Sequence, residues 1–413
     1  MKVLLIGSGG REHALATGLS ADKSVTELHV APGNPGIQEI AVLHPISISD
    51  NQAIVDLAKS LAVDLVVIGP EMPLVNGVAD ELRAQGIATF GPSKAAAQLE
   101  GSKHFAKGVM RDAGVPTAKS FTCETQKEIE RALDTFGAPY VVKDDGLAAG
   151  KGVVVTEDRE IALQHALSCK RVVIEEYLKG PEISLFGISD GKNILPMQPA
   201  QDFKRAYDHD EGPNTGGMGA YSPLPWAPTN IVEDTYTQVL APMIAEMAAR
   251  GTPFVGLLYA GLAVTDRGIK VIEFNARFGD PETQVLIPRL QTPLGQILYK
   301  AATGNLIDST LHWSDESAVT VVLAANGYPS DVKSGDEISN LNAINGVTIF
   351  HAGTKEDGAL RSAGGRVLTV TGVGSDLTEA RDKAYRTVSQ IKLAGSFYRN
   401  DIALNASVAE KGN

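Results

Sequence analysis

The sequence has 413 residues, of which 43% are hydrophobic, and this predicts a soluble chain of roughly two to four domains. Its 49 acidic and 37 basic residues give a net charge of −12, so we expect no nucleic-acid partner, because such binding needs a basic surface. The two cysteines are far apart and no apolar run reaches membrane-spanning length, so we expect a cytoplasmic protein without a disulfide scaffold, zinc site or membrane partner.

The amino-terminal part predicts a Rossmann-like α/β domain. Apolar runs of strand length recur at residues 2–6, 28–30, 64–68 and 87–90. The first runs into the turn G-S-G-G-R-E-H-A and a helix through Leu19, and a helical run later ends at Gly114 and Pro116. Ligands bind at the carboxyl ends of such strands, so the segments after three of them, 7–10, 31–34 and 69–71, should meet at one edge.

The first glycine turn departs from the fingerprint of NAD-binding proteins. Gly7 and Gly9 fit G-x-G-x-x-G, but Glu12 occupies the third position, and the second strand ends without a ribose-binding acid. We therefore disfavour an NAD-dependent dehydrogenase and retain phosphate binding at the start of the helix. We interpret His13, in the same helix, as structural rather than catalytic.

A small α+β unit follows. We expect it to pack against its neighbour, because it is too small to bury a hydrophobic core of its own. Its G-L-A-A-G-K-G segment, residues 146–152, fails the P-loop pattern, since only three residues separate the first two glycines and Gly152 replaces Ser or Thr. It also joins two expected strands. We interpret it as a glycine flap that approaches phosphates together with Lys143 and Lys151; the alternative is a plain surface hairpin.

The next unit contains the pattern that indicates a metal. Residues 269–275 predict a strand on which Glu273 and Asn275 share one face, with Val271 at its base and Arg277 further along if the strand continues. A carboxylate beside an amide oxygen suits Mg²⁺, and arginine suits a phosphate. The alternative is a solvated strand face. The tail from about residue 316 predicts a strand-rich domain.

Three features follow one another along the chain: a lysine with a glycine flap, an acidic strand end, and an E-x-N pattern on a late strand. In this order they resemble the ATP-grasp superfamily. Seven motifs narrow the resemblance to the glycinamide ribonucleotide synthetase family: G-S-G-G-R-E-H-A, A-P-G-N, G-P-E-x-P-L-V, Q-L-E-G-S-K, D-G-L-A-A-G-K-G-V, G-P-N-T-G-G-M-G-A-Y-S-P and V-I-E-F-N-A-R-F-G-D-P-E-T-Q. The resemblance implies a Rossmann-like domain over 1–116, an ATP-grasp lid over 117–181, a central ATP-grasp domain over 182–315 and a carboxyl-terminal domain over 316–413.

The resemblance also implies roles for the matching positions. ATP would be bound by Lys103, Lys143, Gly146, Gly150, Gly152, Glu175, Glu176, Leu178, Glu182 and Asn214. Glu273 and Asn275 would hold Mg²⁺ or Mn²⁺. The substrates 5-phosphoribosylamine and glycine would contact Gly9, Gly10, Arg11, Asn34, Glu71, Asp202, Thr215, Gly216 and Gly217. The groups closest to the chemistry would be Arg277, Lys151 and Asp280.

The implied reaction is ATP-dependent ligation of glycine to 5-phosphoribosylamine through glycyl phosphate, in a protein that we expect to be a monomer. Two features depart from many relatives: Asp144 stands beside the phosphate lysine, and the lid is shortened between residues 156 and 170. Another ATP-grasp carboxylate–amine ligase and a nucleotide-binding protein without turnover remain alternatives.

Overall fold

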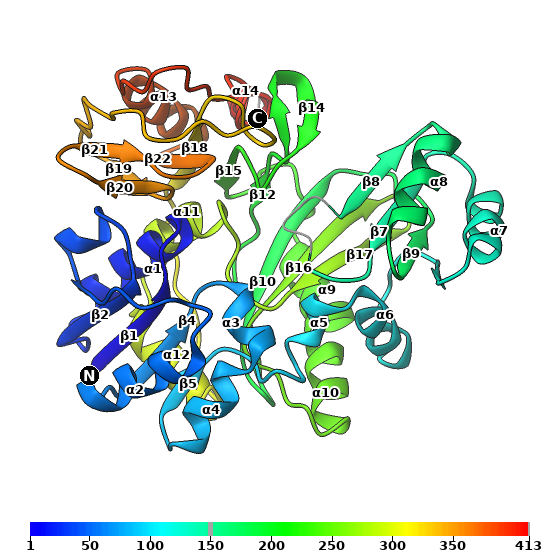
Figure 1. Cartoon of the computed structure of the whole chain (residues 1–413), viewed down its shortest axis with the longest axis horizontal. Helices are drawn as coiled ribbons and strands as arrows, with labels where there is room; N and C mark the ends of the chain where they lie inside the picture. Colours follow the sequence, from blue (N-terminus) through cyan, green and yellow to red (C-terminus); the bar gives the residue numbers. More distant parts are fainter. Residues whose placement is uncertain (148–151, 412–413) are drawn as a thin grey trace.

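The computed structural model describes residues 1–147 and 152–411, and its N-terminal sheet is parallel throughout (Figure 1). The strand order is β3-β2-β1-β4-β5. The strands are β1 Lys2–Gly7, β2 Glu27–Pro32, β3 Val42–Leu43, β4 Leu65–Ile68 and β5 Ala88–Phe90. The helices are α1 Gly10–Ala21, α2 Asn51–Leu61, α3 Glu71–Asn76, α4 Val78–Ala84, α5 Gln98–Gly101 and α6 Lys103–Asp112. The predicted strands are thus confirmed, within one or two residues at their ends.

The small unit predicted over 117–181 projects away from the N-terminal sheet, at the right of Figure 1. Its antiparallel sheet has the order β6-β9-β7-β8, and the helices pack on it. The elements are β6 Ser120–Cys123, α7 Gln126–Phe136, β7 Tyr140–Asp144, β8 Val153–Thr156, α8 Arg159–Ser168 and β9 Val172–Glu175. Ile129 and Leu133 of α7 join Val142 and Ile174 in a separate buried cluster. The expectation that this unit buries no core of its own is therefore wrong, because two helices close over one sheet.

The central sheet is antiparallel, with the order β11-β10-β16-β17. Its strands are β10 Glu182–Asp190, β11 Ile194–Pro196, β16 Val255–Thr265 and β17 Gly268–Asn275. A helical segment before β16 comprises α9 Ile231–Thr235, a π-helical turn Tyr236–Leu240 and α10 Ala241–Ala249. After β17 come α11 Thr283–Leu286 and α12 Leu294–Ala302.

Strand β17 contains an irregularity that changes which side chains share a face. Gly261 pairs with Glu273 and Leu262 with Val271, so Ile272 is an extra residue in the ladder. Such a bulge interrupts the alternation of side chains. Val271 is accordingly buried in the main core and does not lie at the base of the Glu273 face. The strand also ends at Asn275, so Arg277 lies in the following turn.

The last sheet has the order β12-β15-β18-β22-β19 and joins two parts of the chain. Its strands are β12 Gln201–Asp202, β15 Gly219–Ser222, β18 Ser317–Ala324, β19 Val347–His351 and β22 Arg366–Gly374. The hairpins are β13 Arg205–Tyr207 with β14 Glu211–Asn214 and β20 Thr354–Glu356 with β21 Leu360–Ser362, and the helices are α13 Leu377–Val388 and α14 Leu404–Lys411. Because β15 pairs with β18, a strand preceding residue 315 is built into the carboxyl-terminal sheet.

Across the described ranges, 1–147 and 152–411, no helix has the length and apolar character needed to cross a membrane.

Candidate active site

The carboxyl ends of the parallel strands meet at one edge, as the sequence predicts. The N–H of Gly33 donates to the carbonyl of Gly7 at 3.1 Å, and the N–H of Gly69 donates to Ile6 at 2.9 Å. The side chain of Asn34 donates to the carbonyl of Ser8 at 2.8 Å. The three candidate substrate segments therefore form one surface above the sheet.

Glu12 occupies the space that a third fingerprint glycine would leave open. Its carboxylate accepts a hydrogen bond from the N–H of Gly9 at 2.7 Å and one from Arg11 Nε at 2.5 Å. A Cβ added at Gly7 or Gly69 would lie 2.4 or 2.2 Å from Glu12 atoms, so the carboxylate needs both glycines. This glycine turn is thus organised around a buried acid, in agreement with the case against NAD.

His13 lies behind this turn and has the contacts of a structural residue. Its Nδ1 accepts a hydrogen bond from the backbone N–H of His351 at 2.8 Å. Burial, together with the nearby His351, lowers the pKa of His13 to about 3, so the ring is neutral. A neutral ring that accepts a buried backbone hydrogen bond fits the structural interpretation.

Asn34 uses its whole amide group inside the protein. Besides Ser8, Nδ2 donates to the carbonyl of His351 at 2.9 Å, and Oδ1 accepts from the N–H of Ile37 at 3.0 Å. The side chain therefore fixes the turn after β2, and its contact with a substrate stays a prediction.

Arg277 joins the N-terminal unit to the central sheet. Its guanidinium lies 3.5 Å from the carboxylate of Glu71 and 3.2 Å from that of Glu100. Glu100 also accepts a hydrogen bond from the N–H of Ala276 at 2.8 Å. An arginine that only stabilised its own turn would form an ion pair with Asp280 or Glu282. Among the described residues, neither carboxylate forms an ion pair with Arg277. The structure thus places Arg277 at the boundary of two units.

Glu273 and Asn275 offer oxygens suited to a divalent cation. Burial alone raises the pKa of Glu273, but the cations Lys204, Lys143 and Lys103 together hold it below its ordinary value. Within the described part of the chain, the Glu273 carboxylate has no hydrogen-bond or ion-pair partner, and Asn275 Oδ1 has a single long contact with Arg277, at 3.4 Å. Mg²⁺ is commonly held by one or two protein ligands plus phosphate oxygens, so the pair fits such an ion.

Lysines from two elements converge on the same region. Lys143 is buried, and its Nζ lies 2.9 Å from Glu175 and donates to the carbonyl of the bulged Ile272 at 2.8 Å. Glu175 also pairs with Lys107 at 3.0 Å. Lys103, the first residue of α6, donates to the carbonyl of Gly146 at 3.0 Å. The cations predicted to hold phosphates are therefore anchored beside the metal candidate.

The flap itself is described at its two ends only. Gly152 accepts a hydrogen bond from the N–H of Asp144 at 2.7 Å, which continues the β7–β8 hairpin. Asp145 accepts from the N–H of His104 at 3.0 Å and so ties the hairpin to α6. Gly150 and Lys151 lie outside the described residues.

Three further candidate ATP contacts, Glu176, Leu178 and Glu182, follow β9. Glu176 accepts from the N–H of Lys119 at 3.0 Å, Leu178 is half-buried, and Glu182 pairs with Lys204 at 2.8 Å. Lys204 also faces Asp202 of β12. Burial and then the carboxylates of Glu282, Glu182 and Glu273 raise the pKa of Asp202 to about 7, against the opposing effect of Lys204.

The loop Thr215–Gly217 and Asp280 lie together near the glycine turn of β1. Asn214 ends β14 opposite Arg205 in the register. A Cβ on Gly217 would lie 2.5 Å from the ring of Pro281, and a Cβ on Gly9 would lie 3.6 Å from Asp280 Oδ2. The motifs around residues 9, 216 and 280, distant in sequence, thus meet in one place.

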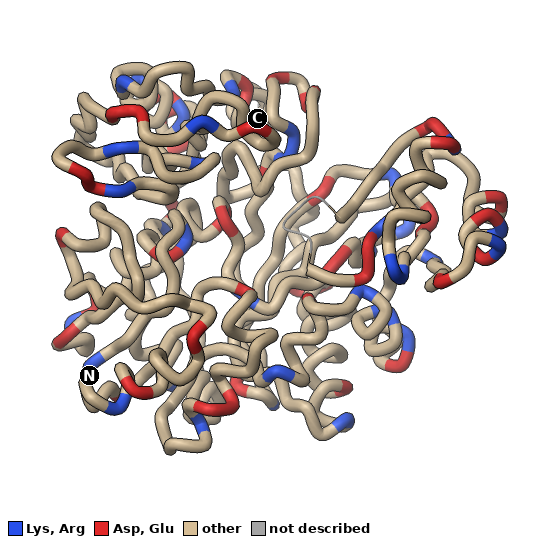
Figure 2. The backbone as a smooth tube through the Cα atoms, viewed as in Figure 1, with Lys and Arg blue, Asp and Glu red and all other residues tan. Residues whose placement is uncertain are grey.

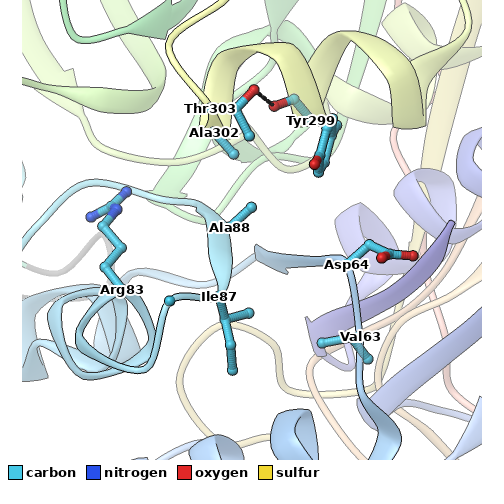
Figure 3. Close-up of a pocket in the computed structure, with 9 residues that line it drawn as sticks. Val63, Asp64, Arg83, Ile87, Ala88, Tyr299, Ala302 and Thr303 are labelled. Carbon is cyan, nitrogen blue, oxygen red and sulfur yellow. Dashed lines mark hydrogen bonds between the residues drawn. The ribbon is translucent and has the colours of Figure 1, made fainter.

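A separate cavity of about 530 Å³ lies at the amino ends of β4 and β5 (Figure 3). Tyr299 and Thr303 of the α12 end lie across from Arg83 and Asp64. This is the opposite edge of the parallel sheet from the candidate site, and no predicted site residue of the described ranges lines it.

In the view of Figure 2, acidic and basic residues are interspersed over all units. The positive charge that anionic ligands need is therefore local, at the lysines beside Glu273.

Sequence reasoning missed five side chains that contact candidate site residues: Glu100 contacts Arg277, Lys107 contacts Glu175, Lys204 contacts Glu182, Tyr328 contacts Gly216, and Arg366 contacts Gly216 and Asp280. Glu100 and Arg277 are 177 positions apart, and no local spacing joins them. Two of them had a usable signal: Glu100 lies within the Q-L-E-G-S-K motif, and Lys204 lies two residues from Asp202 within the D-F-K-R segment.

Three family models match consecutive parts of the chain: the phosphoribosylglycinamide synthetase N domain at residues 1–100, the ATP-grasp (A) domain at 101–283 and the C domain at 318–405. A phosphoribosylamine–glycine ligase of Streptomyces coelicolor is 61% identical over 416 residues, which cover 99% of this chain and all of the relative.

Solved structures agree with these matches. The crystal structure of the phosphoribosylamine–glycine ligase of Thermotoga maritima is 34% identical, has a TM-score of 0.84 and covers 98% of this chain and 100% of that one. The biotin carboxylase domain of a Hydrogenobacter thermophilus 2-oxoglutarate carboxylase, in complex with MgADP, is 16% identical with a TM-score of 0.74, covering 96% and 91%, and shares the fold alone. The resemblance found in the sequence is confirmed: the chain belongs to the phosphoribosylglycinamide synthetase family.

Proposed function

We propose that the protein ligates glycine to 5-phosphoribosylamine at the expense of ATP, giving glycinamide ribonucleotide, ADP and phosphate in the second step of purine synthesis. The observation that carries this proposal is the Glu273 carboxylate, which has no hydrogen-bond or ion-pair partner among the described residues and faces Lys204, Lys143 and Lys103, in a chain matched by all three phosphoribosylglycinamide synthetase family models. ATP and a divalent metal suit this site, and the choice between Mg²⁺ and Mn²⁺ is left to experiment.

The reaction needs a carboxylate to be activated and then attacked by an amine. Phosphorylation of glycine by ATP gives glycyl phosphate and ADP, and the amine of phosphoribosylamine then displaces phosphate. Lys103 and Lys143 would balance the charge of the transferring phosphoryl group, and Arg277 would orient it. Glu273 and Asn275 would hold the metal, which would supply neutralisation of phosphate charge.

Closure over this site would also protect the acyl phosphate from water. The lid predicted over 117–181 is the element suited to that task, since its β7–β8 hairpin carries Lys143 and both described ends of the flap. The boundaries of the four units, the roles of the individual site residues, a monomeric state and a cytoplasmic location remain predictions from the sequence.

Phosphate release measured with each substrate omitted in turn tests the proposal. We expect full-rate ADP formation only with glycine, phosphoribosylamine and ATP together. Equal rates without phosphoribosylamine would instead indicate an ATP-grasp ligase with another acceptor, and ATP binding without any ADP would indicate a nucleotide-binding protein without turnover.

A further inference from the structure

Two side chains of the carboxyl-terminal unit hold both backbone groups of Gly216. The N–H of Gly216 donates to the hydroxyl of Tyr328 at 3.0 Å, and the carbonyl of Gly216 accepts from Arg366 Nη1 at 2.7 Å. A Cβ on Gly216 would lie 3.0 Å from Arg366 Cζ, so the guanidinium occupies the space of a side chain. The substrate loop Thr215–Gly217 is thus held from outside the central unit.

The same arginine holds Asp280. Arg366 Nη1 donates to the carbonyl of Asp280 at 2.7 Å, and Nη2 lies 3.1 Å from its carboxylate. Asp280 Oδ1 also accepts from Gln284 at 2.7 Å. One guanidinium therefore sets the distance between Gly216, a candidate substrate contact, and Asp280, a group predicted to lie closest to the chemistry.

The fold directs Arg366 toward this point by a bulge. Leu323 pairs with Leu368 and Ala324 with Arg366, which leaves Val367 as an extra residue in β22. Bulges redirect side chains and are frequent beside active sites. The Arg366 side chain retains 21% of its exposure, so it is part of the wall of the site rather than of the core.

We propose that Arg366 and Tyr328 are positioning residues for phosphoribosylamine, which hold Gly216 and Asp280 in the geometry that binds this substrate. The proposal rests on the proposed function. Phosphoribosylamine is chosen over ATP because Asp280 lies beside Gly9 of the N-terminal turn, whereas the lysines predicted to hold ATP lie at the lid. On this proposal, the carboxyl-terminal unit contributes positioning residues to the substrate site.

Steady-state kinetics of Tyr328→Phe and Arg366→Gln test the proposal. Tyr328→Phe removes one neutral hydrogen bond and keeps the ring, and we expect kcat/KM for phosphoribosylamine to fall about 3- to 10-fold. Arg366→Gln removes charge-assisted bonds to two loops, and we expect a fall of about 100-fold. The KM for ATP should stay within about twofold in both variants.

A double-mutant cycle and hydrogen exchange give readouts that a purely structural role would not produce. Because both side chains act through Gly216, the double variant should lose about as much as Arg366→Gln alone. The Gly216 amide should exchange faster in Tyr328→Phe. Arg366→Lys should recover only part of the loss, because one ammonium cannot reproduce the planar fork.

Two variants of the same unit serve as matched controls. Tyr385 also accepts a backbone N–H, that of Ile402 at 3.1 Å, and Arg361 also donates to a backbone carbonyl, that of Gly335 at 3.0 Å. Tyr385→Phe and Arg361→Gln should lower the melting temperature without changing KM for phosphoribosylamine. The inference is overturned if Tyr328→Phe and Arg366→Gln behave like these controls in a background where the wild type needs all three substrates. If the wild type itself forms ADP without phosphoribosylamine, the proposed function fails instead.

Discussion

The Glu273 carboxylate is the single group whose removal should affect the chemistry most directly. Glu273→Ala should reduce turnover by at least about a hundredfold, the scale for losing one electrostatic group that stabilises a transition state. High Mg²⁺ should recover part of this loss by mass action. Glu273→Gln, which keeps the shape and removes the charge, is the matched variant. Unchanged turnover at low Mg²⁺ would place the metal elsewhere.

Arg277 should act on the transferring group rather than on ATP affinity. Arg277→Lys keeps the charge but not the planar fork that faces Glu71 and Glu100. We expect turnover to fall about 10- to 100-fold while the Kd for ATP changes by less than about twofold. Arg289→Lys is a suitable control, because Arg289 is a buried arginine that donates to Ser222 and to the carbonyl of Glu316. Near-normal turnover with a lowered melting temperature would make Arg277 a structural brace.

At the scale of elements, helix α1 and strand β19 are joined through two buried neutral histidines. Burial first, then the neighbouring ring, lowers the pKa of His13 to about 3, and burial lowers that of His351 to about 4. Both folded-state values lie below the ordinary 6.5, so the unfolded chain binds more protons. The stability that these rings contribute is present above pH 6.5 and is lost as the pH falls towards 4 and then 3.

Urea unfolding at pH 7 and pH 5 measures this effect. One such histidine should reduce the free energy of unfolding by about 2 kcal/mol at pH 5, since each pKa unit corresponds to about 1.4 kcal/mol. His13→Gln keeps an acceptor for the N–H of His351 and should remove about half of the pH dependence. The exposed His312→Gln should leave it unchanged. An equal pH dependence in wild type and His13→Gln would contradict the assignment.

At the scale of the whole molecule, the shared sheet should make the central and carboxyl-terminal units unfold together. Strand β15 pairs with β18, whereas the small unit of residues 117–181 has a core cluster of its own. Native-state hydrogen exchange should give β15 and β18 amides one common opening free energy and the β7 and β9 amides a smaller one. An opening free energy for β18 that differs from that of β15 and β10 would show that the two units open separately.

The sequence by itself determined the local elements and the family. Apolar runs of strand length located the parallel strands, and Gly114 with Pro116 located the end of the helical run that closes with α6, because these signals act between residues close in the chain. The E-x-N spacing on β17 and the ordered motifs also lie within short segments, so the family and the metal candidate could be predicted.

Only the tertiary structure decided how distant segments are held against one another. Three features show this: the bulge at Ile272, the ion pair of Arg277 with Glu100 and the hydrogen bond of Arg366 to Gly216. The residues involved have no periodic spacing in the sequence that would predict these contacts. Such partners depend on which side chains a fold brings across an interface, and burial then selects the pairs that satisfy one another's charge and hydrogen bonds. For the same reason the sequence left open whether the strand continues to Arg277, whereas the fold ends that strand at Asn275 and places the arginine between two units.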